Sequence, residues 1–142
     1  MKVKLKIGIA LFTGVALVTA GIAGLNAQQG QVPASVGKVE QIVLEALSDA
    51  AGKEVWMATA SFPAGAKVPR HFHYGDEIHY VLEGSWTSEV DGQPPVAKKA
   101  GEWDMVKREV VHGGTIGNTP TKLIVIVIGD KGKPTTTAAP AK

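Results

Sequence analysis

The chain of 142 residues contains no cysteine, which excludes a disulfide framework and a lipid anchor attached through cysteine. It has no stripe of basic residues with interleaved aromatic side chains, so we do not expect nucleic acid as a partner. It also lacks a helix-turn-helix pattern and a second region with its own periodicity, which indicates one folded domain without a transcriptional output element. Histidine is scarce as well, and all four histidines lie between positions 71 and 112.

The first 27 residues have the pattern of a secretory signal peptide. MKVKLK is a basic n-region, the segment from Ile7 to Leu25 is apolar, and Ala27 provides a small residue for cleavage before QQGQ. The alternative is an uncleaved membrane anchor, because the apolar segment has nineteen residues and roughly 20 are needed to cross a bilayer. We expect cleavage, and hence a periplasmic or secreted protein with no membrane contact after the signal is removed.

Cleavage also changes the charge of the chain. Residues 1–27 contain three of the 15 basic residues and none of the 13 acidic residues, so the net charge after cleavage is −1. We expect residues 28–37 to be a linker, 38–130 to form a β-domain, and 131–142 to be a flexible tail. The tail, KGKPTTTAAPAK, is predicted to be frayed because it is low in complexity and in apolar bulk.

The central region is predicted to consist of many short strands. KVEQIVLEAL has an apolar spacing that a helix would tolerate, but the following SDAAGK turn and EVWMATASF favour an antiparallel pair. The run LIVIVI has no polar face, so we expect it to be buried on both sides, in the core or against a second subunit. The pattern predicts an all-β, antiparallel jelly-roll β-barrel. The other strands are expected near residues 68–73, 77–83, 85–90, 96–99, 103–107, 110–113 and 121–129.

Three histidines and one glutamate form a candidate metal site. His71 and His73 are two residues apart, so on a strand their side chains share a face. A turn through Gly75, which we expect to take a positive φ, brings Glu77 back toward this pair, and His112 adds a third imidazole. Such a set suits one divalent ion, Fe, Mn, Ni, Cu or Zn, without choosing among them. Taken singly, the histidines could be ordinary core or surface residues and Glu77 a salt-bridge partner.

The first of these segments resembles the first sequence motif of the cupin superfamily. That motif is a glycine, five residues, HxH, three residues, glutamate, six residues and a glycine. The matching positions are Gly65, His71, His73, Glu77 and Gly84. The resemblance covers roughly residues 38 to 130 and implies a small single-domain cupin of the conserved-barrel (cupin 2) type with a metal inside the barrel.

The second cupin motif is matched less closely. Gly101 opens it and His112 falls where the last histidine ligand of the family stands. The usual proline, second glycine and asparagine are replaced by Lys107, Glu109 and Ile116. These departures leave all four candidate ligands in place and bear on the turn before His112 and hence on the shape of the rim of the pocket.

His79 is the fourth histidine and lies on the same strand face as Glu77. There it could act as a general base or donate a hydrogen bond to a substrate oxygen, and we name His79 and Glu77 as candidate catalytic residues. The alternative for His79 is a core histidine bonded to a backbone carbonyl.

The resemblance implies a metal-dependent oxidoreductase of the dioxygenase type that acts on a small enolic or aromatic compound. A non-redox alternative is a lyase, isomerase or decarboxylase in which the metal is a Lewis acid and His79 moves the proton. A third possibility is a protein that binds a metal or small molecule without turnover. By analogy with the family we also expect a homodimer.

Overall fold

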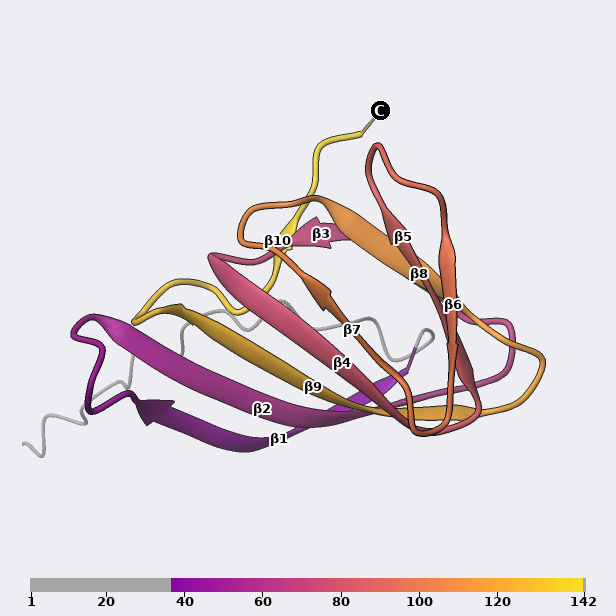
Figure 1. Ribbon diagram of the computed structural model, residues 1–142, viewed down its shortest axis with the longest axis horizontal. Helices are drawn as coiled ribbons and strands as arrows, with labels where there is room; N and C mark the ends of the chain where they lie inside the picture. The colour runs from indigo at the N-terminus through magenta and orange to yellow at the C-terminus, as the bar shows by residue number, and fades with distance from the viewer. Residues whose placement is uncertain (1–36, 142) are drawn as a thin grey trace, which may run out of the picture.

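The computed structural model describes residues 37–141. The predicted signal peptide and all but the last residue of the predicted linker lie in residues 1–36, outside the described residues. The described chain forms ten strands in two antiparallel sheets of five strands each (Figure 1). Within residues 37–141, no helix is long and apolar enough to cross a membrane. The predicted all-β fold class is confirmed.

The chain passes repeatedly from one sheet to the other, as expected for a jelly roll. The first sheet has the order β1 (Lys38–Ala46), β2 (Lys53–Phe62), β9 (Thr121–Asp130), β4 (Gly75–Glu83) and β7 (Trp103–Val106). The second has the order β10 (Thr137–Ala138), β3 (Lys67–Phe72), β8 (His112–Ile116), β5 (Ser85–Val90) and β6 (Val96–Lys99). The sheets converge at the lower right of Figure 1. Consecutive strands such as β3 and β4 therefore lie in opposite sheets.

The core lies between the sheets and is built from alternating residues of each strand. Along β9, Leu123, Val125 and Val127 point inward and are buried. The run LIVIVI was expected to be buried on both sides, but the opposite face of β9 is only partly covered, and Ile128 is 41% exposed. The side-chain period of two explains this, because only one face of the strand can meet the second sheet. The inner cluster comprises Ala60, Phe62, Val81, Trp86, Ile116, Leu123 and Val125.

The ends of the domain are formed by β1 and by the C-terminal segment. β1 pairs with β2 over its whole length, so the predicted antiparallel pair is confirmed and no helix forms there. The tail differs from the expectation of a frayed end, because Thr137 and Ala138 pair with β3. Backbone hydrogen bonds at a sheet edge do not require apolar side chains, which is why composition alone missed them.

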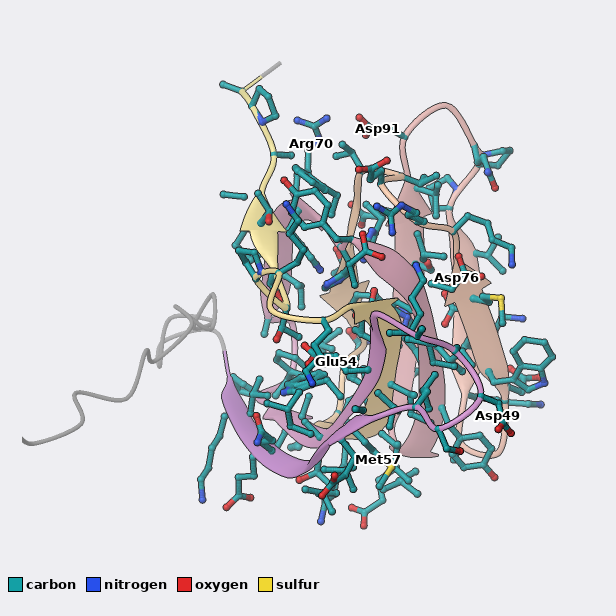
Figure 2. The ribbon with its side chains drawn as sticks, turned by 90° about the vertical axis from the view of Figure 1, so that its left-hand side faces the viewer. Asp49, Glu54, Met57, Arg70, Asp76 and Asp91 are labelled. Atoms are coloured by element: carbon teal, nitrogen blue, oxygen red, sulfur yellow. The ribbon has the colours of Figure 1, made fainter. Side chains whose placement is uncertain are left out.

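Near this edge Arg70 and Asp91 form a surface ion pair (Figure 2).

Gly75 begins β4, and its role differs from the positive φ expected of it. Its φ is not among the positive values, and β4 begins at Gly75 instead of Glu77. A Cβ atom at this position would lie 2.3 Å from the carbonyl oxygen of Ile128 and 2.4 Å from the Cα of Gly129. The absence of a side chain therefore allows β4 to approach β9 closely, two residues before Glu77.

We expect Gly75→Val to lower the free energy of unfolding by about 3 kcal/mol, because the backbone of β9 cannot move aside as a flexible side chain would. Denaturant unfolding followed by tryptophan fluorescence measures this loss. Gly92→Asn is the matched control, since Gly92 has open space around it and asparagine tolerates its positive φ. Equal unfolding midpoints for Gly75→Val and the unsubstituted chain would contradict the close approach of β4 to β9.

Candidate metal centre

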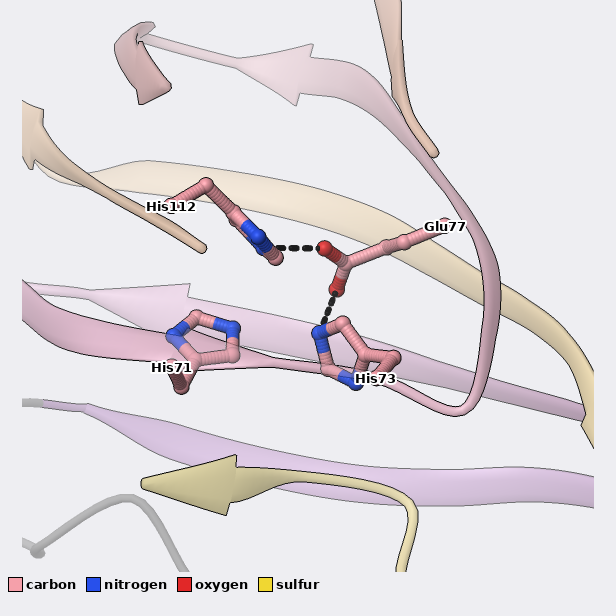
Figure 3. A group of neighbouring side chains, drawn as sticks. All are labelled: His71, His73, Glu77 and His112. Atoms are coloured by element: carbon pink, nitrogen blue, oxygen red, sulfur yellow. Dashed lines mark ion pairs between the residues drawn. The ribbon is translucent and has the colours of Figure 1, made fainter. Parts of the chain in front are cut away.

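Three strands from both sheets bring the four predicted ligands together. β3 carries His71, His73 follows its end, and β8 begins with His112, which is directly opposite His71 in the β3–β8 register. Glu77 comes from β4 in the other sheet. One ligand atom from each of these residues lies within 4.8 Å of the others (Figure 3). The side chains predicted from sequence spacing therefore converge at one point between the sheets.

Glu77 is at the centre of this group. Its Oε2 lies 2.6 Å from Nε2 of His112, and its Oε1 lies 3.1 Å from Nε2 of His73. The His71 ring is next to that of His112, with 4.3 Å between the ring centroids. His73, Glu77 and His112 are buried, and His71 is partly buried at the edge of the group. A buried carboxylate among imidazoles is costly to leave without a compensating charge.

The hydrogen bonds of the outer ring nitrogens fix the tautomers that a metal requires. Nδ1 of His71 donates to the carbonyl of Pro69 at 2.8 Å, and Nδ1 of His112 donates to the carbonyl of Val110 at 3.0 Å. Nδ1 of His73 donates to the carbonyl of Thr135. A carbonyl can only accept, so each Nδ1 carries a proton, and Nε2 is the nitrogen of each ring that can offer a lone pair to a metal.

The inward-facing atoms have no other partner. Nε2 of His73, Nε2 of His112 and Oε2 of Glu77 are buried, and none makes a hydrogen bond of acceptable geometry despite the short distances. Unsatisfied buried polar atoms are rare in folded proteins unless an ion or water completes them. Three imidazoles and one carboxylate are a suitable donor set for a divalent transition metal. The residues present therefore fit a metal at this position.

The electrostatics of the group favour the ligand forms of Glu77 and His71. Burial raises the pKa of Glu77, but the neighbouring His79, His73 and His112 outweigh burial and hold this pKa well below its usual range. Burial lowers the pKa of His71 to about 4, against the opposing effect of Glu77. At neutral pH Glu77 is thus anionic and His71 is neutral, which are the forms that bind a metal.

The lowered pKa of His71 predicts a pH dependence of stability for the metal-free chain. Between the ordinary pKa of 6.5 and about 4, the unfolded chain binds a proton at this residue and the folded chain does not. The contribution of His71 to the free energy of unfolding therefore falls as pH decreases through this window. Urea unfolding at several pH values, compared with His71→Asn, isolates this contribution. A constant difference between the two proteins from pH 7 to pH 4 would contradict the shift.

His79 lies beside this group, between two carboxylates. Its Nε2 is 3.4 Å from Oε2 of Glu77, and its Nδ1 is 3.3 Å from Oδ1 of Asp104. The ring is 4% exposed and packs against Trp86. Burial lowers the pKa of His79, but Glu77 and Asp104 outweigh it and raise this pKa to about 10. The side chain thus faces carboxylates and not the backbone carbonyl considered as an alternative.

Asp104 is the residue of this site that the sequence did not indicate. It lies on β7, directly opposite His79 in the β4–β7 register. Burial raises the pKa of Asp104, but the neighbouring His79 and Ser88 outweigh burial and lower this pKa. Only the pairing of β7 with β4 brings it to His79, and no spacing in the chain predicts that register.

The centre opens on a cavity of about 540 Å³ between the sheets. Its polar lining consists of His71, His73, Glu77 and His79 together with Lys38, Gln41, Arg70, Thr135 and Thr136. Elsewhere its walls are mainly apolar and include the aromatic rings of Trp56, Phe62 and Trp86 together with Val39, Ala60, Val68, Leu123 and Val125. A mainly apolar cavity of this volume with some polar groups in its wall is typical of a small-molecule binding site.

The fold and the donor set define a small β-sandwich domain with a candidate metal centre between its sheets. The sequence profile described as "Cupin domain" matches residues 58–127, a stretch that includes all four candidate ligands. This stretch of the chain is therefore similar to a cupin domain, as the sequence motifs predicted. A search of proteins with curated functions finds no match to the chain.

Solved structures show the same fold. DMSP lyase DddQ from Ruegeria pomeroyi DSS-3 is 21% identical over 72% of this chain and 51% of that chain, with a TM-score of 0.62. An uncharacterised protein with a double-stranded β-helix domain from Klebsiella pneumoniae is 14% identical over 77% and 90% of the two chains, with a TM-score of 0.60. A cupin 2 conserved barrel domain protein from Leptotrichia buccalis is 21% identical over 69% and 43%, with a TM-score of 0.57. This chain spans about half the length of DddQ, and at these identities the likeness concerns the fold.

Proposed function

We propose that the protein is a metal-dependent enzyme with dioxygenase-type chemistry on a small enolic or aromatic compound. The observation that carries the proposal is the convergence of His71, His73, Glu77 and His112, of which the first three line a mainly apolar cavity. Four protein ligands leave two positions on an octahedral ion for other molecules. A substrate with two adjacent oxygens would bind there with its apolar body in the cavity.

A bound divalent ion would supply Lewis acidity and, if redox-active, a place where substrate and dioxygen meet. The protein side chains orient and protect the substrate. Trp56 and Phe62 offer flat apolar walls for a ring, and the buried position of the centre limits access of water. The raised pKa of His79 keeps its ring protonated at neutral pH, so the neighbouring carboxylate of Glu77 is the group that can accept a proton released by a substrate hydroxyl.

Oxygen uptake tests this function. The protein loaded separately with Fe, Mn, Ni, Cu or Zn is assayed in an oxygen electrode against catechols, flavonols and 1,3-diketones. Consumption of dioxygen that requires both substrate and a redox-active metal supports the proposal. Metal binding without oxygen uptake on the whole panel contradicts it and favours a protein that binds a metal or ligand without redox turnover.

A non-redox lyase is the second candidate, and His79 is the observation that favours it. Its ring connects the carboxylates of Glu77 and Asp104 and could move a proton at the edge of the cavity. DddQ, which shares the fold, is described as a lyase, although the low identity extends this likeness no further than the fold. Product formation under strictly anaerobic conditions, with Zn as effective as Fe, would distinguish this function from the first.

We further propose that the protein is exported and forms a homodimer. Export is supported by the signal-peptide pattern of residues 1–27. A dimer is supported by exposed apolar side chains on β7, where Trp103 is 58% and Met105 is 40% exposed. Fractionation of cells and light scattering of the purified protein test the two statements separately.

A further inference from the structure

The C-terminal segment of the described chain crosses the edge of the second sheet. We call residues 134–141 the C-terminal strap. Its strand β10 places Thr137 opposite Phe72 and Ala138 opposite His71. The backbone N–H of Ala139 then donates to the carbonyl of Arg70 at 3.1 Å. The strap is therefore attached to β3 along the residues that carry the first metal ligand.

The Arg70 side chain adds a second attachment. Its guanidinium donates to the carbonyl of Pro140 at 2.9 Å and pairs with Asp91, which lies at the start of the turn after β5. Figure 2 shows Arg70 and Asp91 close together near the C-terminal end of the ribbon. The end of the strap is thus connected through Arg70 to the second sheet.

The strap also contacts a metal ligand directly. His71 and His112 donate from Nδ1 to carbonyls only two residues before them, so their own strands set their tautomers. His73 instead donates from Nδ1 to the carbonyl of Thr135, sixty-two residues away in sequence. His73 is thus the one histidine of the predicted ligand set whose ring orientation depends on the strap. Such a bond, from the far nitrogen of a ligating histidine, orients the ring and raises its basicity.

The same segment forms part of the cavity wall. Thr135, Thr136 and Ala138 line the cavity, on the side where His71 and His73 also reach it. One short segment therefore both contacts a candidate ligand and lines the cavity next to the ligand set.

We propose that the C-terminal strap positions one ligand of the metal centre and closes part of the cavity beside it. The carbonyl of Thr135 holds His73 with Nε2 toward the ion, and β10 closes the cavity beside His71. Thr135 is thus a positioning residue, acting through its backbone. The inference rests on the metal centre proposed above and adds to it a segment that the sequence predicted to be frayed.

Two nested truncations test the strap. A chain ending at Pro134 lacks Thr135 and β10, whereas a chain ending at Ala139 keeps both, together with the N–H that bonds to Arg70. Affinity for Zn²⁺ is measured by competition with a chromophoric chelator, and the thermal midpoint of each metal-free protein is recorded. We expect the shorter chain to bind Zn²⁺ roughly 10- to 100-fold more weakly, the range for loss of a bond to a ligating histidine. The longer truncated chain should bind like the full chain.

Equal Zn²⁺ affinity of all three proteins would overturn the inference while leaving the metal centre intact. If the shorter chain does not fold, the ¹⁵N spectrum of the histidine rings in the full metal-free chain tests whether the strap holds His73. We expect His73 to carry its proton on Nδ1, in slow exchange with solvent. A ring protonated only on Nε2, or one that exchanges freely, would overturn the inference. A full chain that takes up no Zn²⁺ would instead refute the metal centre, and the His73 spectrum would still decide whether the strap holds the ring.

Discussion

Substitution of His112 by alanine is expected to remove nearly all metal binding. His112 is fully buried, and its Nε2 lies 2.6 Å from Glu77 with no other partner. The substitution removes one of the four donors to the metal. It also removes the imidazole that lies next to the buried carboxylate of Glu77. We expect affinity to fall by more than about 100-fold, the upper range for loss of an outer partner alone. Elemental analysis after equilibration with a fixed free metal concentration measures the loss.

The matched control for this experiment is Thr121→Val. Thr121 is also buried and polar, and its hydroxyl bonds to the backbone of Ser85. Neither residue belongs to the group of four converging ligands. This control is expected to lose about 1 kcal/mol of stability from the broken hydrogen bonds and to keep its metal. Full metal occupancy in His112→Ala would contradict the four-ligand assignment.

Substitution of His79 by alanine is expected to have the opposite pattern, with metal retained and turnover lost. His79 contacts Glu77 through Nε2 and Asp104 through Nδ1, and it lies outside the group of four converging ligands. If His79 moves a proton, its removal should lower kcat by about 10²- to 10⁴-fold, the usual contribution of a general acid or base. Metal content should remain equal to that of the unsubstituted protein.

Asp104→Asn is the conservative companion of that substitution. The asparagine keeps the size of the side chain and removes the charge that helps to raise the pKa of His79. We expect a smaller loss of turnover and unchanged metal content. Loss of metal from His79→Ala would place His79 among the ligands, and unchanged turnover would assign it a purely structural role.

The strands and the ligand set were predictable because both depend on local periodicity. Alternation along β9 and the two-residue spacing of His71 and His73 follow from the side-chain period of a strand. The positions of Glu77 and His112 followed from motif spacing. The match between prediction and structure is therefore strongest where a single segment determines the geometry.

Contacts between distant segments could not be predicted in the same way. Asp104 meets His79 through the β4–β7 register, and Thr135 meets His73 across sixty-two residues. The low apolar content of the strap also gave no sign of order, because its attachment uses backbone groups. Gly75 was misinterpreted for a related reason, since its closeness to β9 depends on a strand that is distant in sequence.

The central claim is that His71, His73, Glu77 and His112 hold one divalent ion, and elemental analysis of the full protein tests it most directly. The metal content is measured in the protein as purified and again after chelation and reloading with each of Fe, Mn, Ni, Cu and Zn. We predict one tightly bound ion per chain, restored on reloading. A protein that takes up none of these ions, or only in loose and variable amounts, would contradict the account.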